Sequence, residues 1–371
     1  MKKTIGIVLL IFHLMMLSGC WGSKLVQAQT FVTGLGFDFK DNQYIVTFQA
    51  LNFSNIAKQE GGSLVEAPPV LIGQATGASI QLALNKLEQE APLPLYYGHV
   101  ISIVLSKNII ENQLKNVNAF ISQKSLLRYN TWLFGTEDDI KDIFTSESFF
   151  NLPTLYTVLD LPQLQQDRKN LVISNIRYLD YISRYDEPVG SILIPSLTMN
   201  EENYEEDVMK KIAYVNGAYI LSNKKFKGFV TSGDLVGVRW LEQKNDTINI
   251  SFEKEKLNLD VSQSKSRIKV FNEKEPRYKI NINAVAIVEQ NEDSLGTKKI
   301  QKLIEGKIKD DLKLTLTKST DFDTDLLNIT ERAFRLHSQQ WDVKQINEFK
   351  KDSVKNINVD VYIQENQTYK R

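Results

Sequence analysis

The chain has few of the residues on which disulfides, metal sites and many catalytic centres depend. Its 371 residues contain one cysteine and three histidines. A single cysteine excludes an intramolecular disulfide, so packing and hydrogen bonding must stabilise the fold. The patterns GxSxG, GxxxxGK[ST], HExxH and CxxC are also missing. Their absence argues against serine hydrolases, phosphate-loop proteins, zinc peptidases and dithiol enzymes.

The chain also lacks an excess of charge of either sign. Lysine plus arginine and aspartate plus glutamate number 45 each, which gives no basic surplus to attract nucleic acid. A hydrophobic content of 42% and a charged content of 24% are typical of a globular protein. Beyond residue 19 the longest apolar stretches, 99–105 and 280–288, have the length of strands. Nothing after residue 19 is therefore predicted to enter a bilayer.

The first 20 residues have the features of a lipoprotein leader. Two lysines precede an apolar run over residues 5–17, which is typical of a signal peptide and too short to span a bilayer. Leu17-Ser18-Gly19-Cys20 resembles the bacterial lipobox. The resemblance implies cleavage between Gly19 and Cys20, and an N-palmitoyl and S-diacylglycerol group on Cys20. The alternative is an ordinary secretory peptide with a coincidental cysteine.

A lipid on Cys20 would hold the mature chain on a membrane without crossing it, because two or more acyl chains give a long-lived anchor. The expected location is the outer face of that membrane. Trp21 follows the anchor directly. It is the first candidate for contact with a partner or with lipid headgroups, since tryptophan favours the membrane interface.

Residues 20–145 alternate between strand and helix patterns. Period-two alternation predicts a hairpin over 31–53 with a polar turn at 40–43, and Gly34 and Gly36 indicate bulges or a close backbone approach. Further along, the pattern predicts helices over 77–88, 109–120 and 137–144, and strands over 99–106 and 128–134. We therefore expect an N-terminal α/β lobe over 20–145.

The remaining residues divide into two regions. Residues 146–204 are less periodic, contain four prolines and run into the acidic stretch Glu201–Asp207, so we expect a middle lobe or linker. Residues 205–371 are rich in strand patterns, with helices predicted over 300–312 and 326–338, and form the expected C-terminal α+β lobe. The predicted fold class is α/β and α+β, multi-lobed, with helices packed on mixed sheets, after a cleaved signal peptide of residues 1–19.

Candidate catalytic and metal-binding residues have simple structural interpretations. His99 opens an apolar strand, where an imidazole most often satisfies a loop carbonyl, and His337 is expected on the solvated face of a helix. The pairs Asp138–Asp139 and Asp310–Asp311 are predicted to lie on the solvated surface, because adjacent helical residues point to different faces.

Two further patterns are also interpreted as structural. The DFDTD run at 321–325 has alternate acids but lacks the glycine and terminal glutamate of a calcium loop. Trp240 and Trp341 belong to apolar helical faces and are predicted to anchor the core. We therefore predict no catalytic residue, no cofactor site and no metal site.

Several segments carry a resemblance when they are taken in order. They are Gly19-Cys20-Trp21, GLGFDF with YIVTFQALNF, YYGHVISIVL, RYNTWLF, GAYILSNKKFKGFVTSGDLVGVRWL, and residues 321–341. In this order they resemble the Ger(x)C family, the lipoprotein C subunits of spore germinant receptors. The resemblance implies a three-lobed α/β protein without enzymatic activity, on the outer face of the spore inner membrane, beside a membrane-spanning A subunit and a transporter-like B subunit.

The chain departs from the family pattern at two places. Gly22 stands where members commonly carry an acidic residue, and residues 325–329 replace a turn that commonly contains glycine. These departures affect local contacts, and hence partner identity, more than membership.

Two other classes stay open. A lipid-anchored solute-binding protein would have a cleft between two similar lobes, whereas the pattern predicts a helix-alternating first lobe and a β-rich last one. A secreted lipoprotein hydrolase would need a nucleophile near His99 or His337, and no sequence neighbour supplies one.

Overall fold

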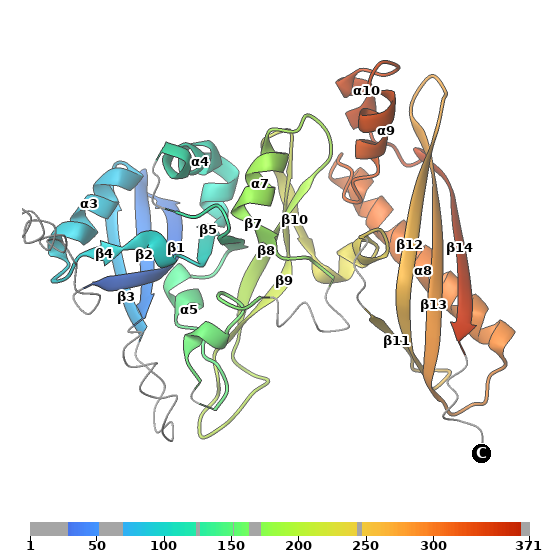
Figure 1. Ribbon diagram of the computed structural model, residues 1–371, viewed down its shortest axis with the longest axis horizontal. Helices are drawn as coiled ribbons and strands as arrows, with labels where there is room; N and C mark the ends of the chain where they lie inside the picture. The colour runs from blue at the N-terminus through green and yellow to red at the C-terminus, as the bar shows by residue number, and fades with distance from the viewer. Residues whose placement is uncertain are drawn as a thin grey trace, which may run out of the picture.

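Two β-sheets organise the computed structural model, which describes residues 29–51, 70–123, 127–150, 152–162, 172–242 and 247–364. Figure 1 shows an elongated molecule with the larger sheet in one part and the smaller sheet in the other. Ten of the described strands form the first sheet and four form the second. The predicted fold class, mixed sheets with helices packed on them, is confirmed. The predicted signal peptide, Cys20 and Trp21 lie outside the described residues.

The first sheet has a parallel centre and antiparallel edges. Its order is β10-β9-β8-β6-β5-β1-β2-β3, with β4 beside β1 and β7 beside β6. β1, β5, β6 and β8 run parallel, and hairpins add β2, β3, β9 and β10. The bounds are β1 Thr30–Lys40, β2 Gln43–Leu51, β3 Val70–Gly77, β4 Leu95–Tyr96, β5 Ser102–Ser106, β6 Trp132–Thr136, β7 Ile176–Arg177, β8 Ile192–Asn200, β9 Ile212–Ser222 and β10 Lys225–Thr231.

Helices cover both faces of this sheet. Along β5, Ile103 and Leu105 face a core that includes α3 (Ile80–Glu90), α4 (Leu114–Gln123) and α7 (Tyr178–Tyr185). Val104, between them, faces the core that α5 (Ile140–Phe144) completes. Successive strand side chains point to opposite faces, so a continuous apolar run is what a strand buried on both sides requires.

Two glycines on β1 let α5 approach the sheet closely. A Cβ atom at Gly36 would lie 2.4 Å from Cγ2 of Ile140, and one at Gly34 would lie 2.9 Å from Cε1 of Phe144. The register between β1 and β2 also shifts between Val32 and Gly34. The predicted close backbone approach and the predicted bulge are both present.

The predicted turn at 40–43 is confirmed, and a second hairpin has a turn of the same kind. Asp41 and Asn42 join β1 to β2 with φ of 50° and 60°, and Asn223 and Lys224 join β9 to β10 with φ of 51° and 63°. Two consecutive residues with positive φ are the requirement of a tight two-residue hairpin turn, and asparagine and aspartate tolerate this conformation.

The second sheet is covered by one long helix. Its order is β11-β12-β13-β14, and β13 runs parallel to β14. α8 connects these two strands and buries Ile300, Ile304, Ile308 and Leu312 at intervals of four residues. This spacing puts the four side chains on one helix face. The bounds are β11 Ile248–Phe252, β12 Leu257–Phe271, β13 Arg277–Asn291, α8 Thr297–Asp321, α9 Thr330–His337, α10 Val343–Asn347 and β14 Val354–Gln364.

The prediction that the two tryptophans anchor the core is confirmed, but Trp341 lies between α9 and α10 and not on a helical face. Trp240 is 0% exposed and Trp341 is 3% exposed, and both belong to the cluster beneath α8. Figure 1 shows α9 and α10 at one end of this part.

Strand pairing does not divide the chain at the predicted lobe boundaries of 145/146 and 204/205. β8 lies in the predicted middle lobe, and β9 and β10 in the predicted C-terminal lobe, yet all three pair in the first sheet. The change from one sheet to the other occurs between Thr231 and Ile248. The boundaries stay a prediction, but hydrogen bonding joins the predicted N-terminal and middle lobes into one sheet.

Several local predictions differ from the structure. The helix predicted from Gly77 begins at Ile80, where the Ser79 side chain accepts a hydrogen bond from Leu82 N, and residues 70–77 form β3 instead. VLIGQATG has little alternation, which hides this edge strand from pattern analysis. α7 was not predicted, because its aromatic residues, such as Tyr178 and Tyr181, are indifferent helix formers and are ordered here by burial.

One buried carboxyl group in the first part has no hydrogen-bond partner among the described residues. Asp160 is 4% exposed, and neither of its oxygens is hydrogen bonded. Burial raises the pKa of this carboxyl from 3.8 to about 8. The folded state therefore retains a proton that the unfolded chain releases near pH 4.

We expect Asp160→Asn to flatten the dependence of stability on pH. Because the folded pKa is raised, the free energy of unfolding of the wild type falls as pH rises from about 4 to about 8. The amide carries no such proton, so the variant should gain more stability relative to the wild type at pH 8 than at pH 5. Urea midpoints at the two pH values measure this, and a constant difference between the two proteins would contradict it.

Candidate functional site

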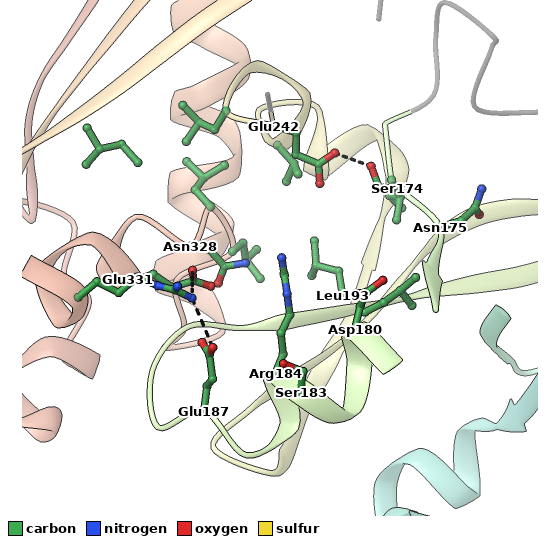
Figure 2. Close-up of a pocket in the computed structure, with 18 residues that line it drawn as sticks. Ser174, Asn175, Asp180, Ser183, Arg184, Glu187, Leu193, Glu242, Asn328 and Glu331 are labelled. Carbon is green, nitrogen blue, oxygen red and sulfur yellow. Dashed lines mark hydrogen bonds and ion pairs between the residues drawn. The ribbon is translucent and has the colours of Figure 1, made fainter. Parts of the chain in front are cut away.

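A cleft of about 700 Å³ lies between the two parts of the molecule. α7 and β8 contribute Asp180, Arg184 and Leu193, and the segments around α9 contribute Asn328 and Glu331. Figure 2 shows these side chains around the cleft, with Arg184 extending from α7 toward its centre. A volume of this size is within the range of small-molecule sites.

An asparagine side chain joins the two parts at the edge of this cleft. Ser191 N donates to Oδ1 of Asn328 over 2.6 Å, and Nδ2 of Asn328 donates to Ser191 O over 3.1 Å. The Ser191 hydroxyl also donates to Asp325 O over 2.8 Å. The Asn328 amide thus pairs with the backbone of Ser191 much as a neighbouring strand would. We call this set of bonds the Asn328 contact.

The backbone at the Asn328 contact takes a conformation that few residues adopt. Asn328 has φ of 51° and Gly190 has φ of 86°. A Cβ atom at Gly190 would lie 2.8 Å from Oδ1 of Asn328. Asparagine is among the side chains that tolerate left-handed φ, and glycine adopts it without steric cost.

Asp325 in the DFDTD run supports this contact. Its carboxylate accepts hydrogen bonds from Leu327 N over 3.1 Å and Thr330 N over 2.7 Å, at the start of α9. Burial raises the pKa of Asp325 to about 6, against the lowering effect of these amides. Of the other acids in the run, Asp321 is exposed and Asp323 lies 4.0 Å from Lys227. The carboxylate of Asp325 is therefore engaged in shaping the turn that holds Asn328.

Three of the charged side chains that line the cleft pair with one another. Arg335 lies 3.3 Å from Glu187 and 3.5 Å from Glu331, so one guanidinium connects α9 with the segment after α7. Burial raises the pKa of Glu331, while the nearby Arg184 opposes that rise. Glu242 accepts a hydrogen bond from Ser174, as Figure 2 shows. The cleft acts mainly as a polar joint between the two parts.

The prediction that Asp311 lies on the solvated surface is wrong. Asp311 is buried where the turns at 232–240 pack against α8. Only 3% of its side chain is exposed. Asp311 accepts hydrogen bonds from Trp240 Nε1 over 3.0 Å, Arg239 Nη2 over 3.2 Å and Lys307 Nζ over 2.7 Å. The prediction considered α8 alone, whereas the turns at 232–240 pack on a second side of that helix. Asp310, its neighbour, is 76% exposed as predicted.

The turns at 232–240 dock on α8 through backbone groups as well. Gly237 N donates to Thr315 Oγ1 over 3.0 Å, and that hydroxyl donates to Asp234 O over 2.8 Å. A Cβ atom at Gly237 would lie 2.8 Å from Asp311 O. The connection between the two sheets is therefore fixed to the helix of the second sheet.

The two histidines beyond the leader lie in different parts of the molecule. The ring of His99 contacts Phe31 and Tyr96 at centroid distances of 5.2 and 5.6 Å, and the ring of His337 contacts Trp341 at 5.6 Å. His337 is on a helix as predicted, at the last residue of α9, but it is half-buried and not on a fully solvated face. His99 ends a short 3-10 turn before β5 rather than opening the strand.

The other carboxylate pair also has structural partners. Asp138 accepts from Thr198 Oγ1 over 2.8 Å and Met199 N over 3.0 Å, which ties the end of β6 to β8. Asp139 accepts from Lys141 N over 2.8 Å at the start of α5. Gly19, Cys20 and Trp21 lie outside the described residues, so the structure does not test the lipidation prediction. Within the described ranges, no helix is both long and apolar enough to cross a membrane.

Family models match nearly the whole chain in two consecutive pieces. Residues 22–199 match the spore germination protein N-terminal domain. Residues 216–367 match the C-terminal domain described as spore germination B3/GerAC like. The chain belongs to the Ger(x)C family of spore germination proteins.

Curated relatives and a solved structure agree with this membership. Spore germination protein KC of Bacillus subtilis is 20% identical, over 97% of this chain and 94% of that protein. Spore germination protein B3 of the same organism is 23% identical, over 92% of this chain and 91% of that protein. The crystal structure of the GerBC protein shares the fold with a TM-score of 0.55 and 18% identity, over 90% of this chain and 96% of that one. The Ger(x)C resemblance found in the sequence is confirmed, and membership supports a role in spore germination.

Proposed function

We propose that this Ger(x)C protein is a non-enzymatic subunit of a nutrient germinant receptor, held by a lipid on Cys20 at the outer face of the spore inner membrane. It acts through assembly with a membrane-spanning A subunit and a transporter-like B subunit. The observation that carries this proposal is the match of both family domains, in order, over residues 22–199 and 216–367. The leader sequence with its single cysteine supports the anchor.

The polar groups of the described residues support a structural role. Asp311, Asp325 and Asn328 are engaged in holding segments of the fold together. His99 and His337 pack against aromatic rings in separate parts. A protein that has two packed parts and sits beside a membrane is suited to contact other subunits over a wide surface.

Replacement of the gene by a Cys20→Ala version tests the anchor and the assembly together. We expect the variant to lose palmitate label and to leave the membrane fraction, because no other segment is predicted to hold the chain at a bilayer. Spores carrying it should lose the response to one set of nutrients, as should spores without the gene. The wild-type chain should co-purify with two membrane-spanning proteins.

His99→Gln and His337→Gln serve as matched controls, because each changes a candidate catalytic group and leaves the leader intact. Both should retain label and response. Label on the Cys20→Ala chain would refute the anchor, and a dead histidine variant that still folds would restore the enzyme hypothesis. Normal germination of spores that lack this gene and its paralogues would refute the receptor role.

A further inference from the structure

A group of exposed aromatic side chains lies at the connection between β8 and β9. We call residues 200–212 the acidic hairpin, because 201–207 contain five carboxylates. Tyr204 on the hairpin is 46% exposed, and its ring lies 5.1 Å from that of Phe149. Phe149 in turn lies 6.2 Å from Phe150, which is 78% exposed. Figure 1 shows the β8–β9 connection extending beyond the end of the first sheet.

Phe150 is held in its exposed position by specific bonds. Its φ of 56° is a left-handed conformation, which costs a non-glycine residue about 1–2 kcal/mol. Phe150 N donates to a carboxylate oxygen of Glu206 over 2.8 Å, and Lys210 lies 3.2 Å from Glu206 and 3.5 Å from Glu147. The bond from Phe150 lowers the pKa of Glu206. These bonds fix a strained loop that presents an apolar ring to solvent.

The charges around these rings favour a basic partner. Glu206 and Glu201 pair with Lys210 and Lys211. The other three carboxylates of the hairpin, on Glu202, Glu205 and Asp207, are exposed and have no ion pair within the described part of the chain. An anionic membrane surface attracts lysine and arginine and repels carboxylates, so it does not suit this hairpin. Aromatic and methionine side chains, such as Met209 here, are enriched in protein interfaces.

We infer that the acidic hairpin, with Phe149 and Phe150, is a docking surface for a protein segment that presents lysine or arginine beside apolar side chains. Phe150 inserts between the partner's apolar groups, and the three unpaired carboxylates face its cations. Buried aromatic anchors surrounded by complementary charge are the usual source of affinity and specificity in such contacts. The inference rests on the proposed function in one respect, which is that the partner is located at the spore membrane.

Photo-crosslinking in spores that express the full-length chain tests this inference. A benzoylphenylalanine at position 150 should form an adduct whose partner peptide contains lysine or arginine next to apolar residues. The same probe at Leu336, which is 59% exposed on α9, should not form that adduct. Reversal of Glu202, Glu205 and Asp207 to lysine should reduce the adduct by about tenfold or more.

A second triple variant distinguishes the local charge of the acidic hairpin from the net charge of the chain. Glu253, Glu289 and Asp293 are exposed carboxylates of the second part, and their conversion to lysine makes the same change in net charge. That variant should leave the adduct at wild-type yield. An equal loss in both triple variants would overturn the inference, as would the absence of an adduct, an adduct with lipid, or an adduct with a second copy of the chain.

The result is independent of the receptor role. If the wild-type chain co-purifies with two membrane proteins and position 150 yields no adduct, the docking surface is wrong and the proposed function stands. If the expected adduct forms but the wild-type chain co-purifies with no membrane-spanning protein, the docking surface stands and the proposed function fails.

Discussion

Asp311→Ala is expected to destabilise the protein by about 3–5 kcal/mol, the range observed when one member of a buried ion pair is removed. The carboxylate is 3% exposed and accepts from Trp240, Arg239 and Lys307. The substitution takes the counter-ion from a guanidinium that is itself only 13% exposed. It also removes the bonds that hold the turns at 232–240 against α8, and these turns connect the two sheets. The urea midpoint of the chain expressed from Trp21 onward measures the loss.

The adjacent residue provides the control. Asp310 is on the same helix and 76% exposed, and its only ion pair among the described residues is with Lys313 at 3.8 Å. Asp310→Ala should change stability by less than about 0.5 kcal/mol, because exposed pairs contribute little. Similar losses from the two substitutions would show that the Asp311 bonds do not stabilise the connection.

Local patterns in the sequence were enough to predict most elements of the fold. The four-residue spacing of Ile300, Ile304, Ile308 and Leu312 predicted α8, and the buried run in β5 predicted a strand. The turn at Asp41 and Asn42 was predicted from composition, since few residues adopt its conformation. Each of these signals depends on neighbours along the chain.

Signals that depend on distant segments were missed. The pairing of β8 with β6 joins residues 61 positions apart, at Gly135 and Ser196, so sequence periodicity could not show that one sheet continues past residue 145. Asp311 looked like a surface acid because its donors, Trp240 and Arg239, lie about 70 residues earlier in the chain. The proposed lipid site at Cys20 is the reverse case. It is predicted from the leader sequence alone and lies outside the described residues.

The second large effect is expected at the joint between the two parts, where Asn328→Ala should cost about 2–4 kcal/mol. The substitution removes both bonds to the Ser191 backbone, and unpaired buried polar groups cost about 1–3 kcal/mol each. It also places alanine at φ of 51°, which asparagine tolerates better. Hydrogen exchange should detect faster exchange of the Ser191 amide, and urea unfolding should report the loss of stability.

Asn328→Gly separates the two causes, because glycine adopts positive φ freely and also lacks the amide. It should be more stable than Asn328→Ala by about 1 kcal/mol, yet exchange the Ser191 amide as fast. Asn356→Ala, at an exposed position on β14, is the matched control and should change stability by less than about 0.5 kcal/mol. Equal stability of the alanine and glycine variants would show that the positive φ at residue 328 does not contribute to the loss. A Ser191 amide that exchanges at the wild-type rate in both would show that the Asn328 contact does not hold the two parts together.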